Sequence, residues 1–136
     1  KTSLSVVDDL WGSPTSVQTL CMAIHAIIQY LDNNNAEVYG TYHVASDGVT
    51  NWYLYACKIL DTLESFKIKL KLKKDYLYPI PSNQYPQDAI RPKNSKLITN
   101  KFEKIFMVKF PHWEEQVSFN LKQINNKKPK TLPTLF

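Results

Sequence analysis

The clearest apolar pattern in the chain begins after residue 14 and has the spacing of one face of an α-helix. Thr15 and Gln18 have the spacing of a capping box at the start of this segment. Apolar residues then recur at intervals of three and four, and they are Val17, Leu20, Cys21, Ile24, Ile27, Ile28 and Leu31. We therefore predict a helix that ends at the polar run 32–35 and turns this apolar face into the core.

Shorter apolar segments on either side of this helix predict strands and a second helix. Residues 4–7 are apolar enough for a short buried strand, and residues 40–45 predict another. Thr50 is a good N-cap residue for a second helix, whose inward stripe consists of Trp52, Ala56, Ile59, Leu60 and Leu63. A helix, a strand and a helix in succession are typical of an α/β layer.

Lysine and aliphatic residues alternate strictly from Lys67 to Lys73. In a strand, this period of two puts four lysines on one face and three aliphatic residues on the other. A lysine-rich strand is typical of a protected sheet edge. The same lysines, followed by Tyr76 and Tyr78, could bind nucleic acid, but a solvated edge explains them without a partner.

The last third of the chain predicts a loop followed by two helices. Residues 78–81 predict an extended segment, 82–92 a long irregular loop, and 100–105 a short helix. A terminal helix follows Pro111, marked by Trp113, Val117, Leu121 and Ile124. Residues 125–136 predict a flexible tail, so the folded portion is expected to span residues 1–124.

Composition narrows the class of protein only slightly. A chain of 136 residues is large enough for one domain with its own core. The net charge of +5 favours an anionic partner, which could be nucleic acid, an acidic lipid surface or a phosphorylated small molecule. No apolar run is long enough to cross a membrane, which predicts a cytoplasmic protein without membrane contacts. Cys21 and Cys57 both fall in helical patterns, so we predict buried thiols.

Two patterns needed for dinucleotide chemistry are absent from the sequence. The glycines are Gly12, Gly40 and Gly48, and they form no closely spaced phosphate-binding turn. No tyrosine is followed by a lysine four residues later, so the chain lacks the helical Tyr-x-x-x-Lys pair. The chain is therefore expected to bind no dinucleotide by itself and to contain no catalytic residue.

Metal ligation and carboxylate catalysis are also not indicated. His25, His43 and His112 are scattered over three predicted elements, without the spacing of zinc ligands. Asp8 and Asp9 are adjacent, so their side chains diverge in an extended segment.

Three segments, taken together, resemble dTDP-4-dehydrorhamnose reductases. Residues 7–15 are similar to the family's V-x-D-Q-x-G-x-P-T segment, and residues 40–56 to its G-x-Y-H-x-A strand and the following S/T-W-x-x-F/Y-A helix. The third match is to P-I-x-x-x-x-Y-P-x-x-A-x-R-P-x-x-S-x-L-x-T-x-K-[LF], carried by Pro79, Ile80, Tyr85, Pro86, Arg91, Pro92, Asn94, Ser95, Leu97, Thr99, Lys101 and Phe102. The order and spacing of the segments, over about residues 4–120, make the resemblance specific.

The resemblance implies an α/β chain from an extended short-chain reductase with a Rossmann-like fold. Such enzymes use NADPH or NADH to reduce the 4-keto group of a dTDP-4-dehydro sugar in dTDP-L-rhamnose synthesis. By this resemblance the chain is the C-terminal, substrate-binding portion, with a few strands and three or four helices. The cofactor-binding half would be supplied in the same polypeptide or as a separate chain.

The resemblance also implies the position of a dTDP-sugar site. Its residues would be Trp11, Gly12, Ser13, Pro14 and Thr15, which line the cleft. Arg91 would contact the substrate phosphate or order its own loop, since guanidinium geometry suits both roles.

Several positions depart from the family pattern and keep other functions open. Leu10 stands where the family commonly has Gln, and Lys96 and Ile98 replace Arg and Asp. One alternative is a non-catalytic module that binds a sugar nucleotide or a protein. The other is a basic nucleic-acid binder. Without the cofactor half, strand 41–45 would leave an unpaired edge and an exposed apolar face. This predicts association with a partner, rearrangement of the strand, or self-pairing into a homo-oligomer.

Overall fold

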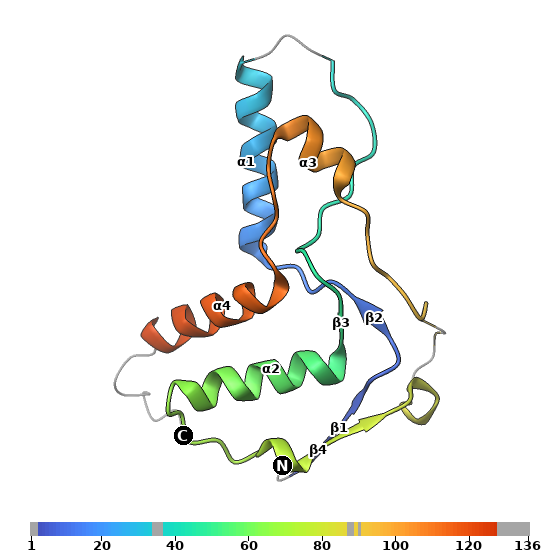
Figure 1. The fold of residues 1–136 in the computed structure, drawn as a ribbon, viewed down its shortest axis with the longest axis vertical. Coiled ribbons are helices and arrows are strands. Elements are labelled where there is room, and N and C mark those ends of the chain that lie inside the picture. The colour runs from blue at the N-terminus through green and yellow to red at the C-terminus, as the bar shows by residue number, and fades with distance from the viewer. Residues whose placement is uncertain (1–2, 34–36, 87–88, 90, 128–136) are drawn as a thin grey trace, which may run out of the picture.

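The protein is an α/β assembly of four helices and four short strands over the residues described by the computed structural model, which are 3–33, 37–86, 89 and 91–127 (Figure 1). The strands are β1 Leu4–Val7, β2 Trp11–Gly12, β3 Thr50–Asn51 and β4 Leu77–Ile80. The helices are α1 Val17–Asn33, α2 Trp52–Ser65, α3 Asn100–Phe106 and α4 Trp113–Lys127. Two 3₁₀ turns, η1 Lys74–Tyr76 and η2 Ser82–Gln84, flank β4. The predicted α/β class is confirmed.

The strands form two small sheets. In one, β1 runs parallel to β4, with Leu4 opposite Leu77 and Val7 opposite Ile80. In the other, β2 runs antiparallel to β3. Two-stranded sheets are marginal by themselves, and α2 stabilises the first one because it packs on both β1 and β4, while α4 packs beside α2 (Figure 1).

An aromatic cluster on α3 and the segment after it forms a second packing centre. Phe102 is 1% exposed, and its ring centroid lies 4.5 Å from that of Phe106 and 5.4 Å from that of Phe110. Ala23 and Ala26 of α1 complete the buried part of the cluster. The predicted helices at 100–105 and after Pro111 are thus confirmed, with α3 lying against α1 (Figure 1).

Helix α1 forms as predicted, but the prediction of its buried face is wrong. Val17, Ile24 and Ile28 are 70%, 57% and 52% exposed, while the opposite face carries the buried Ala23 and Ala26. Small side chains allow α1 to approach the phenylalanines of α3 closely, whereas the larger aliphatic stripe faces away from them. The stripe is defined by Val17, Leu20, Ile24, Ile28 and Leu31, and we call it the α1 stripe.

Details of capping and cysteine burial also differ from the predictions. Ser16 rather than Thr15 caps α1, because its Oγ accepts a hydrogen bond from the Thr19 amide at 3.1 Å. Asn51 rather than Thr50 caps α2, where its Oδ1 accepts from the Leu54 amide at 2.8 Å. Cys57 is buried as predicted, but Cys21 is exposed next to the α1 stripe. Trp52, predicted to point inward, is 57% exposed.

Residues 41–45, predicted to be part of a strand, do not pair as a strand with any other described segment. Tyr42 and Val44 are partly buried against the aromatic cluster, whereas Thr41 and His43 are exposed. No backbone hydrogen bond joins residues 42–45 to another described residue. The segment therefore shows the alternating burial expected of a strand. A second segment that would pair with its backbone is not among the described residues.

The predicted lysine strand is also wrong, although its alternation survives. Residues 67–73 form a turn and a loop, with Lys67 in the left-handed region at φ 56°. The lysines are exposed, and Ile68, Leu70 and Leu72 are half-buried. Packing of the aliphatic side chains keeps exposed and half-buried residues in alternation. No strand of the described residues pairs with the backbone of this segment.

The C-terminal boundary is only partly described. Helix α4 continues through residue 127, beyond the predicted boundary at 124. Residues 128–136 lie outside the described residues, so the flexible tail stays a prediction. None of the helices in the described part of the chain is long and apolar enough to cross a membrane, and the cytoplasmic location also stays a prediction.

Candidate functional site

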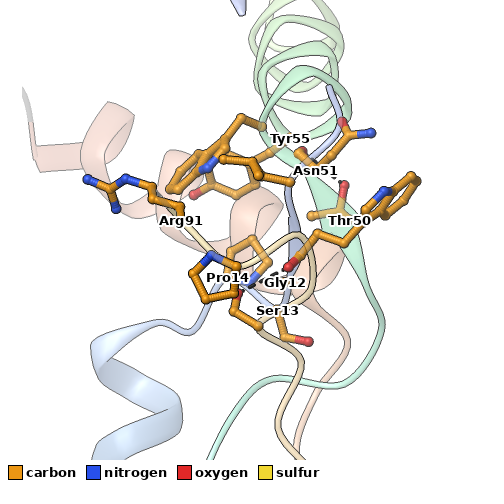
Figure 2. Close-up of a pocket in the computed structure, with 12 residues that line it drawn as sticks. Gly12, Ser13, Pro14, Thr50, Asn51, Tyr55 and Arg91 are labelled. Carbon is orange, nitrogen blue, oxygen red and sulfur yellow. Dashed lines mark hydrogen bonds between the residues drawn. The ribbon is translucent and has the colours of Figure 1, made fainter. Parts of the chain in front are cut away.

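A pocket of about 260 Å³ opens where β2, the first turn of α2 and the segment 91–95 meet (Figure 2). Most of its wall is apolar or aromatic, with a small number of polar side chains. The lining residues are Leu10, Trp11, Gly12, Ser13, Pro14, Thr50, Asn51, Trp52, Tyr55, Arg91, Pro92 and Ser95. The tertiary structure thus brings together five of the six predicted site residues from two distant parts of the chain.

Backbone hydrogen bonds fix the segment 93–95 along β2. The Trp11 amide donates to the Lys93 carbonyl at 2.8 Å, and the Ser95 amide donates to the Trp11 carbonyl at 2.8 Å. The Ser95 hydroxyl donates to the same carbonyl at 3.0 Å. Gly12 faces this segment, and a Cβ atom there would lie 2.7 Å from Ser95 Oγ. The absence of a side chain at Gly12 therefore allows the two segments to approach.

Ser13 and Thr15 tie the pocket to the loop before β3. The Ser13 hydroxyl donates to the Gly48 carbonyl at 2.6 Å, and Gly48 has φ 81°, which favours glycine. Thr15 Oγ1 donates to the Ser13 carbonyl at 3.0 Å and accepts from the Ser46 amide at 3.2 Å. Thr15 does not line the pocket, so its contribution in this chain is to hold the backbone.

The first turn of α2 supplies the pocket residues that were not singled out from the sequence. Trp52 and Tyr55 provide aromatic rings whose centroids are 6.3 Å apart and whose planes lie at 88°. In the neighbouring strand β3, Thr50 lies opposite Gly12 of β2, and Asn51 lies opposite Trp11. The resemblance already included Thr50, Trp52 and Ser95 among its matched positions, and that signal could have identified them. Leu10, which replaces the family's usual Gln, is buried and makes this part of the wall apolar.

Arg91 lies at the rim of the pocket. Figure 2 shows its guanidinium group directed away from Gly12 and Thr50, and the residue is exposed. The group is therefore available to a charged ligand that extends beyond the apolar floor.

A polar cluster of Asp9, Ser82 and Lys93 lies just behind this rim. Asp9 Oδ1 accepts from the Ser82 amide at 2.9 Å, and Asp9 Oδ2 accepts from the Ser82 hydroxyl at 3.1 Å. Lys93 Nζ forms an ion pair with Asp9 Oδ2 and donates to Ser82 Oγ at 3.0 Å. The hydrogen bond from Lys93 is the largest effect on the Asp9 carboxyl and lowers its pKa. Desolvation comes second and opposes this change, and the two hydrogen bonds from Ser82 lower the pKa further.

The lowered pKa of Asp9 predicts an acid-sensitive contribution to stability. Its folded-state pKa lies below the unfolded value of about 3.9, so the stabilisation is present above that pH and is lost as pH falls through the folded pKa. We expect Lys93→Met to lower the free energy of unfolding at pH 6, with the difference from wild type shrinking below about pH 4. Urea unfolding at a series of pH values measures this. A difference that is independent of pH would assign the effect to the lysine's methylene groups instead.

The described residues offer no obvious metal centre. His25 and His43 are exposed on different segments, and His112 is half-buried beside α4. Among the described residues, no three His, Cys, Asp or Glu side chains are grouped to hold a metal ion.

The three glycines do not fit a dinucleotide. Next to Gly12 lies Ser95 Oγ, and a Cβ atom at Gly40 would lie 3.2 Å from Lys101 Nζ. A Cβ atom at Gly48 would clash with His112 and would lie 2.9 Å from Trp113. Each glycine thus accommodates this chain's own side chains.

The chain is similar in sequence to a known protein family. The family model described as the RmlD substrate binding domain matches residues 1–126. The chain is 40% identical over 114 residues to the dTDP-4-dehydrorhamnose reductase of Salmonella typhimurium, covering 82% of this chain and 36% of the relative. It is 37% identical over 123 residues to the reductase of Escherichia coli K12, covering 89% and 40%.

A solved structure shares the fold. The crystal structure of dTDP-4-dehydrorhamnose reductase from Bacillus anthracis, determined in complex with NADP, aligns with a TM-score of 0.72 and 28% identity. The alignment covers 90% of this chain and 39% of that one. The chain therefore spans about 40% of the length of the reductases that it matches.

The fold is an α/β arrangement that matches part of the solved dTDP-4-dehydrorhamnose reductase structure. With the family model matching most of its length, the chain belongs to the RmlD substrate-binding family, that of the dTDP-4-dehydrorhamnose reductases.

Proposed function

We propose that this chain is the dTDP-sugar-binding portion of a dTDP-4-dehydrorhamnose reductase-like protein and is not catalytic by itself. The observation that carries the proposal is the pocket in which Trp11–Pro14, the first turn of α2 and Arg91 converge. In the whole protein the reaction would be the reduction of a dTDP-4-keto sugar by NADPH or NADH.

The chemistry of the pocket suits a nucleotide with a charged tail. Trp52 and Tyr55 offer aromatic faces on which a pyrimidine ring can stack. Arg91 at the rim offers a fork of donors for a diphosphate. The N-terminus of the 14-residue helix α2 lies at the same pocket and favours negative charge there.

We propose that the partner of this chain is an α/β cofactor-binding half, in the same polypeptide or as a separate chain. Two features support this partner: the exposed α1 stripe, and the extended residues 42–45, whose backbone groups form no bonds among the described residues. A partner with a parallel sheet would account for both features. The edge strand of that sheet would pair with the backbone of residues 42–45, and its remaining surface would cover the α1 stripe. The dinucleotide, which does not fit the glycines of this chain, would bind that half.

Calorimetric titration of the chain with dTDP tests the proposed site. We expect Arg91→Ala to weaken binding about tenfold or more, because a charge-assisted hydrogen bond contributes about 1.5–3 kcal/mol. Arg91→Lys should recover only part of the affinity, because an ammonium group cannot form the bidentate contact.

The matched control is Lys104→Ala on α3, which removes an exposed cation that does not line the pocket. It should leave dTDP affinity unchanged. Equal affinities of wild type and Arg91→Ala would refute the role of Arg91, and a folded chain that does not bind dTDP would refute a preformed site.

A further inference from the structure

We infer that Asp9, Ser82 and Lys93 form a positioning clamp that holds segment 91–95 against β2 and so sets the mouth of the pocket. The part of this inference that concerns ligand affinity rests on the proposed function. The clamp itself can be tested without any ligand.

The clamp joins the segment after β1 to two nearby segments more than 70 residues further along the chain. Asp9 follows β1, Ser82 follows β4, and Lys93 lies in the pocket segment, 84 residues from Asp9. Both carboxylate oxygens of Asp9 are used, because Oδ1 accepts from the Ser82 amide and Oδ2 accepts from Ser82 and Lys93. Ser82 is buried and Asp9 is half-buried, whereas the Lys93 side chain is 67% exposed, so water competes mainly for the lysine.

The clamp lies next to the backbone bonds that build the pocket wall. The Lys93 carbonyl accepts from Trp11, two residues after Asp9, and the Ser95 amide returns a bond to the Trp11 carbonyl. Side-chain pairing of Lys93 with Asp9 therefore acts on the same two segments as this backbone pairing. Arg91 belongs to the segment so held, and its position at the rim depends on where Lys93 is anchored.

The charges of the cluster favour a structural anchor over proton transfer. Lys93 keeps Asp9 ionised, and Asp9 in turn accepts the Ser82 hydroxyl proton in a hydrogen bond. Because the carboxylate, hydroxyl and ammonium groups are hydrogen-bonded to one another, they fix the relative positions of their three segments. This is the role expected of residues that support a binding residue such as Arg91.

Amide hydrogen exchange, measured residue by residue with NMR, tests the clamp. Lys93→Met and Asp9→Asn should speed exchange at the Trp11 and Ser95 amides about fivefold, as expected for loss of a partly exposed ion pair. The Asp47 and Trp113 amides, which bond the Pro111 and Asp47 carbonyls elsewhere, should be unaffected. Lys93→Arg should restore slow exchange because it retains the charge.

The matched control is the pair of Lys74 and Asp61, which lies away from the pocket with its atoms 2.7 Å apart. Lys74→Met removes the same kind of interaction and should leave the Trp11 and Ser95 amides unchanged. Unchanged exchange in Lys93→Met and Asp9→Asn would overturn the clamp. Acceleration by the same factor at every amide would also overturn it, because the cluster would then support only the fold as a whole and not segment 91–95 in particular.

Titration of the same variants with dTDP tests the link to the site. With the clamp confirmed by exchange, Lys93→Met should weaken dTDP binding severalfold and Lys93→Arg should restore it. Variants with altered exchange but wild-type affinity would overturn the effect on the pocket. A folded wild type that binds no dTDP would instead refute the proposed function, while the exchange data would still decide the clamp.

Discussion

Replacing Ile24 and Ile28 of α1 by lysine is expected to convert a self-associating chain into a monomer. Both side chains are more than half exposed in the α1 stripe, and burial of one such side chain contributes about 1.5–3 kcal/mol. A contiguous apolar stripe of this kind marks an interaction surface, and in the absence of the cofactor half a second copy of the chain can cover it. Sedimentation velocity at increasing concentration measures the change.

The control places two lysines on the same helix but on its polar side. His25 and Gln29 are exposed and lie outside the α1 stripe, so His25→Lys with Gln29→Lys adds the same number of lysines without removing apolar surface. This variant should associate like the wild type. A wild-type chain that stays monomeric at all concentrations would contradict the prediction.

Phe102→Ala is expected to have the largest effect on stability. The side chain is 1% exposed and contacts Phe106 and Phe110 in the core that joins α3 to α1. Removing a buried phenylalanine costs about 3–5 kcal/mol, which is a large part of the total stability of a small domain, about 5–15 kcal/mol. Urea unfolding followed by circular dichroism measures this loss.

Phe119→Ala provides the matched comparison. Phe119 lies on α4 and is 48% exposed, so the same truncation should cost much less. Equal losses for the two variants would mean that the aromatic cluster around Phe102 is not the dominant core.

Sequence patterns were sufficient where a structural element depends on its own residues. The helical spacing of apolar residues correctly predicted α1, α2 and α4, because this periodicity follows from backbone geometry alone. The three matched segments likewise predicted the family and brought Trp11–Pro14 and Arg91 to one site. The family prediction is confirmed, while the role of these residues as a binding site stays a prediction.

Only the tertiary structure decided which surfaces of these elements are buried. Helix α1 carries two helically spaced stripes, one aliphatic and one of small residues at Thr19, Ala23 and Ala26, and close packing on the α3 phenylalanines selected the second. Residues 41–45 and 67–73 have the alternation of strands but no strand partner among the described residues. A strand forms only when a second segment supplies hydrogen-bonding partners for its backbone. Which face of a helix is buried depends likewise on the segments packed against it. The sequence by itself therefore determined the helices and the family, while tertiary contacts determined the strands, the pocket and the exposed α1 stripe.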